Sequence, residues 1–258
     1  KHGRYKYDAN KYQHKSETCK IHFAMDKPLC LGGPVPRSFS DIRYKNHRKV
    51  ALKLYTKKEH FERELKVHNA IAEQMGDFAV TLKRHHKESG EYPYILVMEQ
   101  AEISLYHELG SKRIRKVDDI IQIFKGVCEL VKKLHNLENN FVHGDIKPRN
   151  ILKVRDEYKL CDFDLTMKVG EEREANEKCS SGYIPPEFAR LKFTGESSRM
   201  IKVLPSFDIW SLGVLLFELC TGNHLFPQDI SDDNLVNDID KQILCAWHTI
   251  PDSKLKGV

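Results

Sequence analysis

The chain has 258 residues, of which 40% are apolar and 31% are charged, and its formal net charge at pH 7 is +5. This length can bury a sizeable core in one large domain or two lobes, and so modest and dispersed a charge does not indicate nucleic-acid binding. No apolar run approaches the roughly 18 residues that a membrane span needs, and no signal peptide pattern opens the chain.

The seven cysteines are an odd number, scattered singly with no CxxC pair. This spacing is not that of a zinc site or of a disulfide framework. We therefore expect reduced thiols in a soluble, cytoplasmic protein.

Residues 1–28 are rich in Lys, His and Tyr, have weak periodicity and do not begin with Met. We predict an N-terminal extension and prefer a plain tail to a basic binding arm. The chain is then expected to be part of a larger multidomain protein. Residues 31–39 follow as a turn-rich stretch between predicted strands.

Val50–Lys53 predicts an apolar strand that ends in a lysine. Thr56–Glu59 has the form of a helix capping box and opens a predicted helix to about Met75. The helical period places five residues on one buried stripe: Phe61, Leu65, His68, Ala72 and Met75. Glu64 lies at the edge of this stripe, from where its carboxylate could reach Lys53.

Two further strands are predicted at 78–83 and 94–99, joined by a turn at 88–91, and residues 100–104 link them to the helical part of the chain. From residue 104 the pattern is mostly helical. Apolar residues at helical spacing predict helices at 118–137 and 207–220, and Gly222 fits the end of the second one.

Phe141–Asp164 gathers two aspartates, an amide and a lysine between the predicted helices. Apolar runs at 151–152 and 158–161, separated by a charged turn, predict a strand hairpin. Such a hairpin returns Asp162 to the loop that carries Asp145 and Asn150, so we expect these three side chains to converge.

Six motifs in order over residues 30–250 resemble a eukaryotic-type protein kinase domain. They are Val50–Lys53, Glu64, His143–Asn150, Asp162–Asp164, Pro185–Glu187 and Asp208–Gly213. The resemblance implies a bilobal α+β fold. Residues 29–101 would form an N-lobe of antiparallel sheet plus one long helix, with the hinge. Residues 102–258 would form a mostly helical C-lobe that looks truncated.

The same resemblance implies ATP and Mg²⁺ as cofactors. Lys53 would hold the ATP phosphates, with Glu64 orienting its ammonium group. Asn150 and Asp162 would bind the metal, because hard oxygen ligands suit Mg²⁺. Asp145 would orient the substrate hydroxyl and accept its proton, and Lys147 would lie along the transferring phosphate.

For the adenine ring, the resemblance implies a pocket backed by Met98, with hinge backbone from Glu99 to Ala101. Ala51 and Leu152 would sandwich the ring. Gly32 would belong to the glycine-rich roof over the phosphates.

The sequence departs from the family pattern at several positions. Pro34, Arg37 and Phe39 occupy the roof, where proline has no backbone N–H to offer. Asp164 replaces a glycine, His68 takes an apolar position, and Gly144 stands where many members have an arginine that binds a phosphorylated segment. An inserted loop is expected around 192–202, and the last 36 or so residues lack the arginine that would pair with Glu187.

The predicted function is a serine/threonine protein kinase with a protein substrate, because Lys147 and Ser180 match that branch. The alternative is a pseudokinase that acts as a nucleotide-binding or scaffolding module. A kinase of small molecules is disfavoured, because Ser180–Glu187 resembles a protein-substrate platform.

Overall fold

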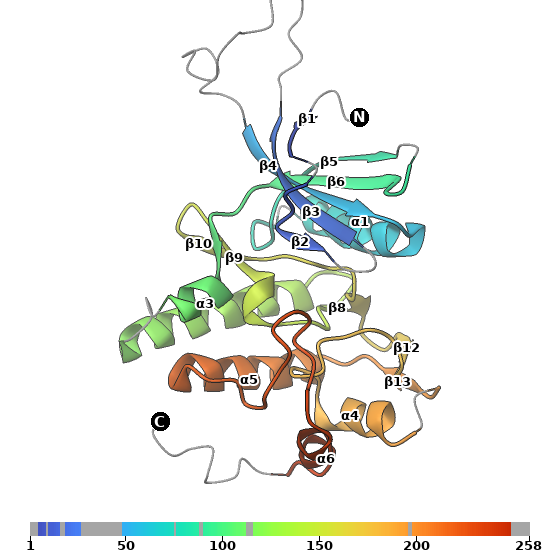
Figure 1. The fold of residues 1–258 in the computed structure, drawn as a ribbon, viewed down its shortest axis with the longest axis vertical. Helices are drawn as coiled ribbons and strands as arrows, with labels where there is room; N and C mark the ends of the chain where they lie inside the picture. The colour runs from blue at the N-terminus through green and yellow to red at the C-terminus, as the bar shows by residue number, and fades with distance from the viewer. Residues whose placement is uncertain are drawn as a thin grey trace, which may run out of the picture.

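The structure is a computed structural model that describes residues 5–8, 10–15, 19–26, 48–74, 76–87, 90–111, 116–195 and 198–248. Figure 1 shows a strand-rich part with helix α1 at one end of the molecule and the helices α3 to α6 at the other. The predicted bilobal α+β fold is confirmed.

The upper sheet is antiparallel, with strand order β1-β3-β4-β6-β5 and with β2 paired to β3. Its strands are β1 (Tyr5–Lys6), β2 (His14–Lys15), β3 (Cys19–Asp26), β4 (Arg48–Tyr55), β5 (Leu82–Lys87) and β6 (Tyr94–Glu99). β4 and β6 contain the predicted strands at Val50–Lys53 and 94–99. They are central strands, so their apolar residues are buried from both sides.

Two sequence predictions for this lobe were wrong. Cys19–Asp26 lies in the predicted extension, yet it pairs with β4 along its whole length, so this strand belongs to the sheet. The strand predicted at 78–83 begins only at Leu82. The apolar residues 78–80 are instead buried beneath the sheet, where Ala79 forms a bridge to Leu160.

Helix α1 (Lys58–Glu73) has Lys57 as its N-cap, one residue later than the predicted Thr56, and the Lys57 side chain makes no capping bond. Its buried face consists of Phe61, Glu64, Val67, His68, Ala70 and Ile71. Ala72 is exposed and Leu65 only half-buried. The stripe is rotated from the predicted one because Glu64, a charged residue, points into the protein.

The lower lobe begins with short strand β7 (Ile103–Ser104) and helices α2 (Leu105–Gly110) and α3 (Val117–His135). Next come β8 (Phe141–Val142), the 3₁₀ turn η2 (Pro148–Asn150), and the predicted hairpin of β9 (Ile151–Val154) and β10 (Glu157–Leu160). Arg155 and Asp156 make its turn with positive φ angles. No helix in the described part of the chain is long and apolar enough to cross a membrane.

The remaining elements are β11 (Met167–Lys168), β12 (Glu172–Glu174), α4 (Pro186–Phe193), β13 (Met200–Lys202), α5 (Ser206–Thr221) and α6 (Asp238–Cys245). β13 lies in the predicted insert at 192–202 and pairs with β12. Helix α5 ends at Gly222, which takes the left-handed conformation (φ 68°), as predicted.

One apolar cluster joins the two lobes. It combines Val67 and Ile71 of α1 with Leu134 of α3, Phe163 and Leu215 of α5. The C-terminal half of helix α1 therefore packs on the lower lobe, and its N-terminal half faces the sheet. This packing fixes the position of Glu64 relative to β4.

We expect Leu134→Ala to lower the free energy of unfolding by about 3 kcal/mol, because Leu134 is fully buried in this cluster and its loss leaves a cavity. Ile121→Ala on the same helix is the matched control. Its side chain is 41% exposed, so stability should change by no more than about 0.5 kcal/mol. Urea denaturation measures both, and equal losses would contradict the assignment of this core.

Candidate functional site

A buried lysine forms the centre of the site. The Lys53 ammonium lies 2.6 Å from Oε2 of Glu64 and 2.5 Å from Oδ1 of Asp162, and the Tyr55 hydroxyl also donates to Glu64. Lys53 and Glu64 have almost no exposed surface. The structure thus brings together three predicted site residues from β4, α1 and the turn after β10.

These charges stabilise each other's ionised forms. Burial would lower the pKa of Lys53, but Asp162 and Glu64 outweigh it and hold that pKa well above its usual value. Burial would raise the pKa of Glu64 and of Asp162, but the Lys53 ammonium outweighs it, so both pKa values are lowered. Lys53, Glu64 and Asp162 are therefore all charged at neutral pH.

A second group of predicted residues meets on the loop between β8 and β9. Asn150 donates through Nδ2 to the carbonyl and to Oδ2 of Asp145, both at 2.9 Å. Lys147 lies 3.1 Å from the same Oδ2 and donates to Oγ of Ser180 at 2.5 Å. One carboxylate oxygen of Asp145 is thereby fixed by two neighbours. Both Asp145 and Asn150 are buried.

This loop is anchored from below by a residue whose role was not predicted. The fully buried carboxylate of Asp208, at the start of α5, accepts hydrogen bonds from the backbone amides of His143 (2.8 Å) and Gly144 (2.9 Å). It also bonds Nε2 of His135 at 2.7 Å. Because three donors converge on Asp208, the loop that precedes Asp145 is held against α5.

Asp233 is a second residue that sequence analysis missed. Its carboxylate, in the segment after α5, lies 3.1 Å from the Lys147 ammonium and 3.0 Å from Nε of Arg149. Burial would lower the pKa of Lys147, but Asp145 and Asp233 raise it. No local motif marks Asp233, which lies 84 residues from Arg149 along the chain.

The turn after β10 is unusual for its residue types. Asp162 has a left-handed backbone (φ 66°), which aspartate tolerates better than most residues. Asp164 lies next to it, and burial together with the Asp162 charge raises the pKa of Asp164 well above its usual value. His68 packs edge-on against Phe163 at 5.2 Å, so the predicted departure at His68 places an imidazole beside this ring.

The sheet register determines which residues face the same side as Lys53. Ala51, two residues before it on β4, pairs with Phe23 of β3 on one side and with Met98 of β6 on the other. Residues opposite each other on paired strands share a face. Phe23 is 41% exposed, so it offers an aromatic ring on this face. Alternation of Ile21 and Phe23 within residues 19–26 was the available signal.

The other residues predicted to contact adenine lie on elements next to the row of Phe23, Ala51 and Met98. Leu152 of β9 packs with the cluster that contains Met98. The amide of Glu99 donates to Thr81, and its side chain bonds the Thr81 amide and Lys159. Ala101 follows β6 in an irregular, half-buried segment before β7.

Gly32, with Pro34, Arg37 and Phe39, lies outside the described residues. The segment that contains them leaves β3 at Asp26 and enters β4 at Arg48, five residues before Lys53. Among the described residues, the strand pair β2–β3 lies at the Lys53 end of the sheet.

The residues present fit a Mg²⁺ ion that is shared with phosphates. Asp162 supplies a carboxylate, and Asn150 uses its Nδ2 toward Asp145, which leaves its side-chain oxygen for a ligand. In the described part of the chain no three His, Cys, Asp or Glu residues gather as a metal site. This set suits Mg²⁺, which takes one or two protein oxygens and completes its shell with waters and substrate phosphates.

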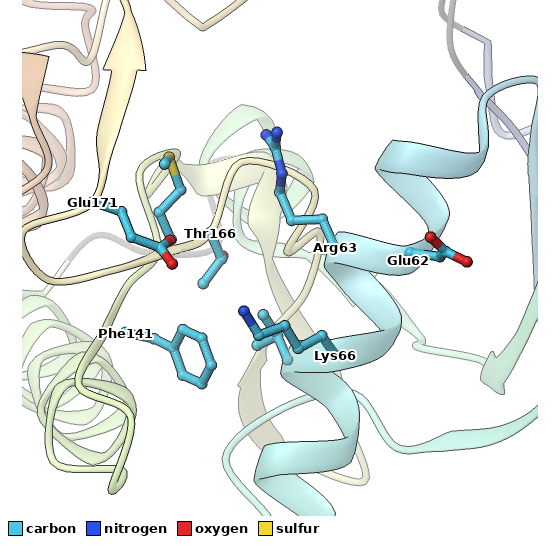
Figure 2. Close-up of a pocket in the computed structure, with 8 residues that line it drawn as sticks. Glu62, Arg63, Lys66, Phe141, Thr166 and Glu171 are labelled. Atoms are coloured by element: carbon cyan, nitrogen blue, oxygen red, sulfur yellow. The ribbon is translucent and has the colours of Figure 1, made fainter. Parts of the chain in front are cut away.

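A cavity of about 320 Å³ lies beside the site, between α1 and residues 166–171. Figure 2 shows Arg63 and Lys66 of α1 across from Phe141, Thr166 and Glu171. Arg63 donates to the backbone carbonyl of Asp164 at 3.2 Å, so α1 also holds the turn after Asp162. None of the three charged residues Lys53, Glu64 and Asp162 lines this cavity.

Comparison with known proteins gives consistent matches. The family model described as Protein kinase domain matches residues 35–256. A putative serine/threonine-protein kinase of Mycoplasma pneumoniae is 30% identical over 53% of this chain and 38% of its own length. MAP kinase-activated protein kinase 5 of Mus musculus is 24% identical over 92% of this chain and 53% of its own length. The chain thus spans about half of these relatives or less.

We expect Glu64→Gln to lower the free energy of unfolding by about 3 kcal/mol, because it leaves a buried ammonium with one partner fewer. Glu62→Gln is the matched control, since Glu62 pairs with Lys58 at the surface of the same helix and should contribute less than about 1 kcal/mol. Chemical denaturation at pH 7 compares them. Equal small losses would show that the Lys53–Glu64 pair is not buried as described.

Proposed function

Since the chain belongs to the protein kinase domain family, we propose that it is a serine/threonine protein kinase that transfers the γ-phosphate of ATP to a protein hydroxyl. One observation carries the proposal. A buried ammonium, Lys53, is oriented by Glu64 and Asp162, and the hairpin β9–β10 returns Asp162 to Asn150, which holds Asp145.

The nucleotide would bind against the face of the sheet that carries Ala51 and Lys53. Phe23 and Ala51 would cover one side of the adenine ring, Leu152 would cover the other, and Met98 would close the back. The strand register and the cluster of Leu152 with Met98 support this placement. The backbone between Glu99 and Ala101 would bond the adenine edge. Lys53 then neutralises the α- and β-phosphates, and its pairing with Glu64 keeps the ammonium in one position while the nucleotide binds.

When bound, Mg²⁺ would supply positive charge that offsets the charge of the phosphates. Asp162 and Asn150 would hold it. Asp145 would orient the substrate hydroxyl and accept its proton with its remaining carboxylate oxygen, because Asn150 and Lys147 occupy the other oxygen. Lys147 lies beside Asp145 and would neutralise charge on the phosphate in transfer.

The serine/threonine preference rests on the contact between Lys147 and Ser180. This bond joins the loop of Asp145 to Ser180–Glu187, the stretch proposed to receive a protein substrate. Tyr183 in the same stretch bonds both carboxylate oxygens of Glu218 on α5, at 2.9 Å each. A rigid platform beside Asp145 favours a protein substrate over a small molecule. We place the kinase in the cytoplasm and within a larger protein as part of this proposal.

A nucleotide-binding module without transferase activity is the second candidate. It is favoured by the carboxyl group of Asp164 beside Asp162, and by the absence of glycine from the sequence of residues 5–26, which contains strands β2 and β3. Fewer backbone N–H groups can approach phosphates where side chains are present.

We expect Asp145→Asn to lower phosphate transfer at least about 100-fold, because an amide cannot accept the hydroxyl proton. Transfer of radiolabelled phosphate from ATP to a generic protein substrate measures this. Asp156→Asn, in the β9–β10 turn with a 95% exposed side chain, is the matched control and should keep full activity. Equal incorporation by Asp145→Asn and the unmodified protein would refute the proposed mechanism.

We further expect Mg-ATP to stabilise the protein, by about 2.7 kcal/mol at 100 times its dissociation constant. Thermal denaturation with and without Mg-ATP measures the effect. A shift without phosphate transfer would support the nucleotide-binding module, and no shift with no transfer would exclude both candidates.

A further inference from the structure

The hairpin of β2 and β3 extends the sheet over the site. His14 of β2 pairs with Ile21 of β3, and Ile21 pairs with Lys53 of β4. The amide of Gln13 donates to the carbonyl of Ile21 at 2.8 Å, which fixes this register. His14 and Lys53 are thus two strands apart on one row, at about 9.5 Å between backbones, and their side chains project from the same face of the sheet.

Charged groups on other elements than the β2–β3 hairpin lie near enough to His14 to affect its pKa. Those that act on it are Lys53 of β4, Asp162 after β10, and Lys147 and Arg149 of the loop before β9. These elements include the residues proposed to hold the phosphates. On its own hairpin, Lys15 and Lys20 pair with each other and project from the opposite face.

We propose that His14 is a phosphate-binding residue of the nucleotide site, donating an imidazole N–H to the ATP triphosphate from above while Lys53 and Lys147 contact it from the other sides. The inference rests on the proposed nucleotide binding and adds a residue to it. Residues 5–26 contain no glycine, so close approach of their backbone N–H groups to phosphates is hindered by side chains. The His14 side chain would provide a hydrogen-bond donor in their place.

The charges around His14 favour this role. Partial desolvation, together with Lys53, Lys147 and Arg149, lowers the pKa of His14 below 6.5, although Asp162 opposes the shift. The imidazole is therefore mostly neutral before the nucleotide binds. A triphosphate placed among these cations reverses the local potential and favours the imidazolium, so ATP binding takes up a proton at His14.

The test compares the affinities of His14→Ala and Lys15→Ala for Mg-ATP and for adenosine, which lacks phosphates. We expect His14→Ala to weaken Mg-ATP binding about tenfold and to leave adenosine binding unchanged, because one charge-assisted hydrogen bond is lost. Lys15→Ala removes a neighbouring positive charge from the other face and should change neither affinity. Calorimetry on the full chain measures all of these.

A pH series separates direct contact from a structural effect. Between pH 8 and pH 6 the unmodified protein should gain more affinity for Mg-ATP than His14→Ala does, because only the former takes up a proton at residue 14. Titration of ATP itself is common to both proteins and cancels in the comparison. Equal melting temperatures without ligand would show that the substitution leaves the fold intact.

The outcomes are distinct. Equal weakening of ATP and adenosine by His14→Ala, or equal effects of the His14 and Lys15 substitutions, would overturn the role of His14 while nucleotide binding stands. If the unmodified protein binds no Mg-ATP, the proposed function fails and this inference fails with it.

Discussion

The Lys53 ammonium is the charge on which the site depends. It lies in the sheet with almost no contact with water, and a buried charge is tolerated only where opposite charges offset its desolvation. Glu64 and Asp162 supply those charges from two different elements. The requirement to pair one ammonium therefore fixes α1 against the sheet and fixes the turn after β10 beneath it.

Sequence reasoning predicted the parts of this arrangement that local patterns encode. The apolar runs of β4, β6 and α5 and the β9–β10 hairpin follow from periodicity and turn residues. The hairpin also accounts for the return of the chain to Asn150, where the Cys161 amide donates to the Asn150 carbonyl at 3.1 Å just before Asp162. The face of α1 was misjudged because an apolar stripe was assumed, whereas burial of Glu64 depends on Lys53, which a helical pattern does not contain.

The features that sequence reasoning missed act through long-range pairing. β3 has mixed polar and apolar residues and gains its place by pairing with distant β4 as well as with β1 and β2. Residues 19–26 therefore resembled a tail, and Phe23 and His14 were overlooked. Asp208 and Asp233 anchor the loop around Asp145 from positions more than 60 residues away. The pattern around Asp208 indicated only the start of a helix, and nothing adjacent to Asp233 distinguishes it from an ordinary surface aspartate.

Gly144 shows how the structure accommodates one departure from the family pattern. Its φ is +76°, and a Cβ there would lie 3.0 Å from the Leu165 carbonyl, so an arginine at this position would be strained. Arg173 of β12 places Nη1 3.8 Å from that same Cβ position. The Arg173 side chain is almost fully buried, lies over the Phe188 ring and faces Glu177 at 3.4 Å. The positive charge beside the loop of Gly144 is thus that of Arg173, on strand β12, which is held in place by pairing with β13. The contacts of Arg173 with Phe188 and Glu177 do not require a phosphate group.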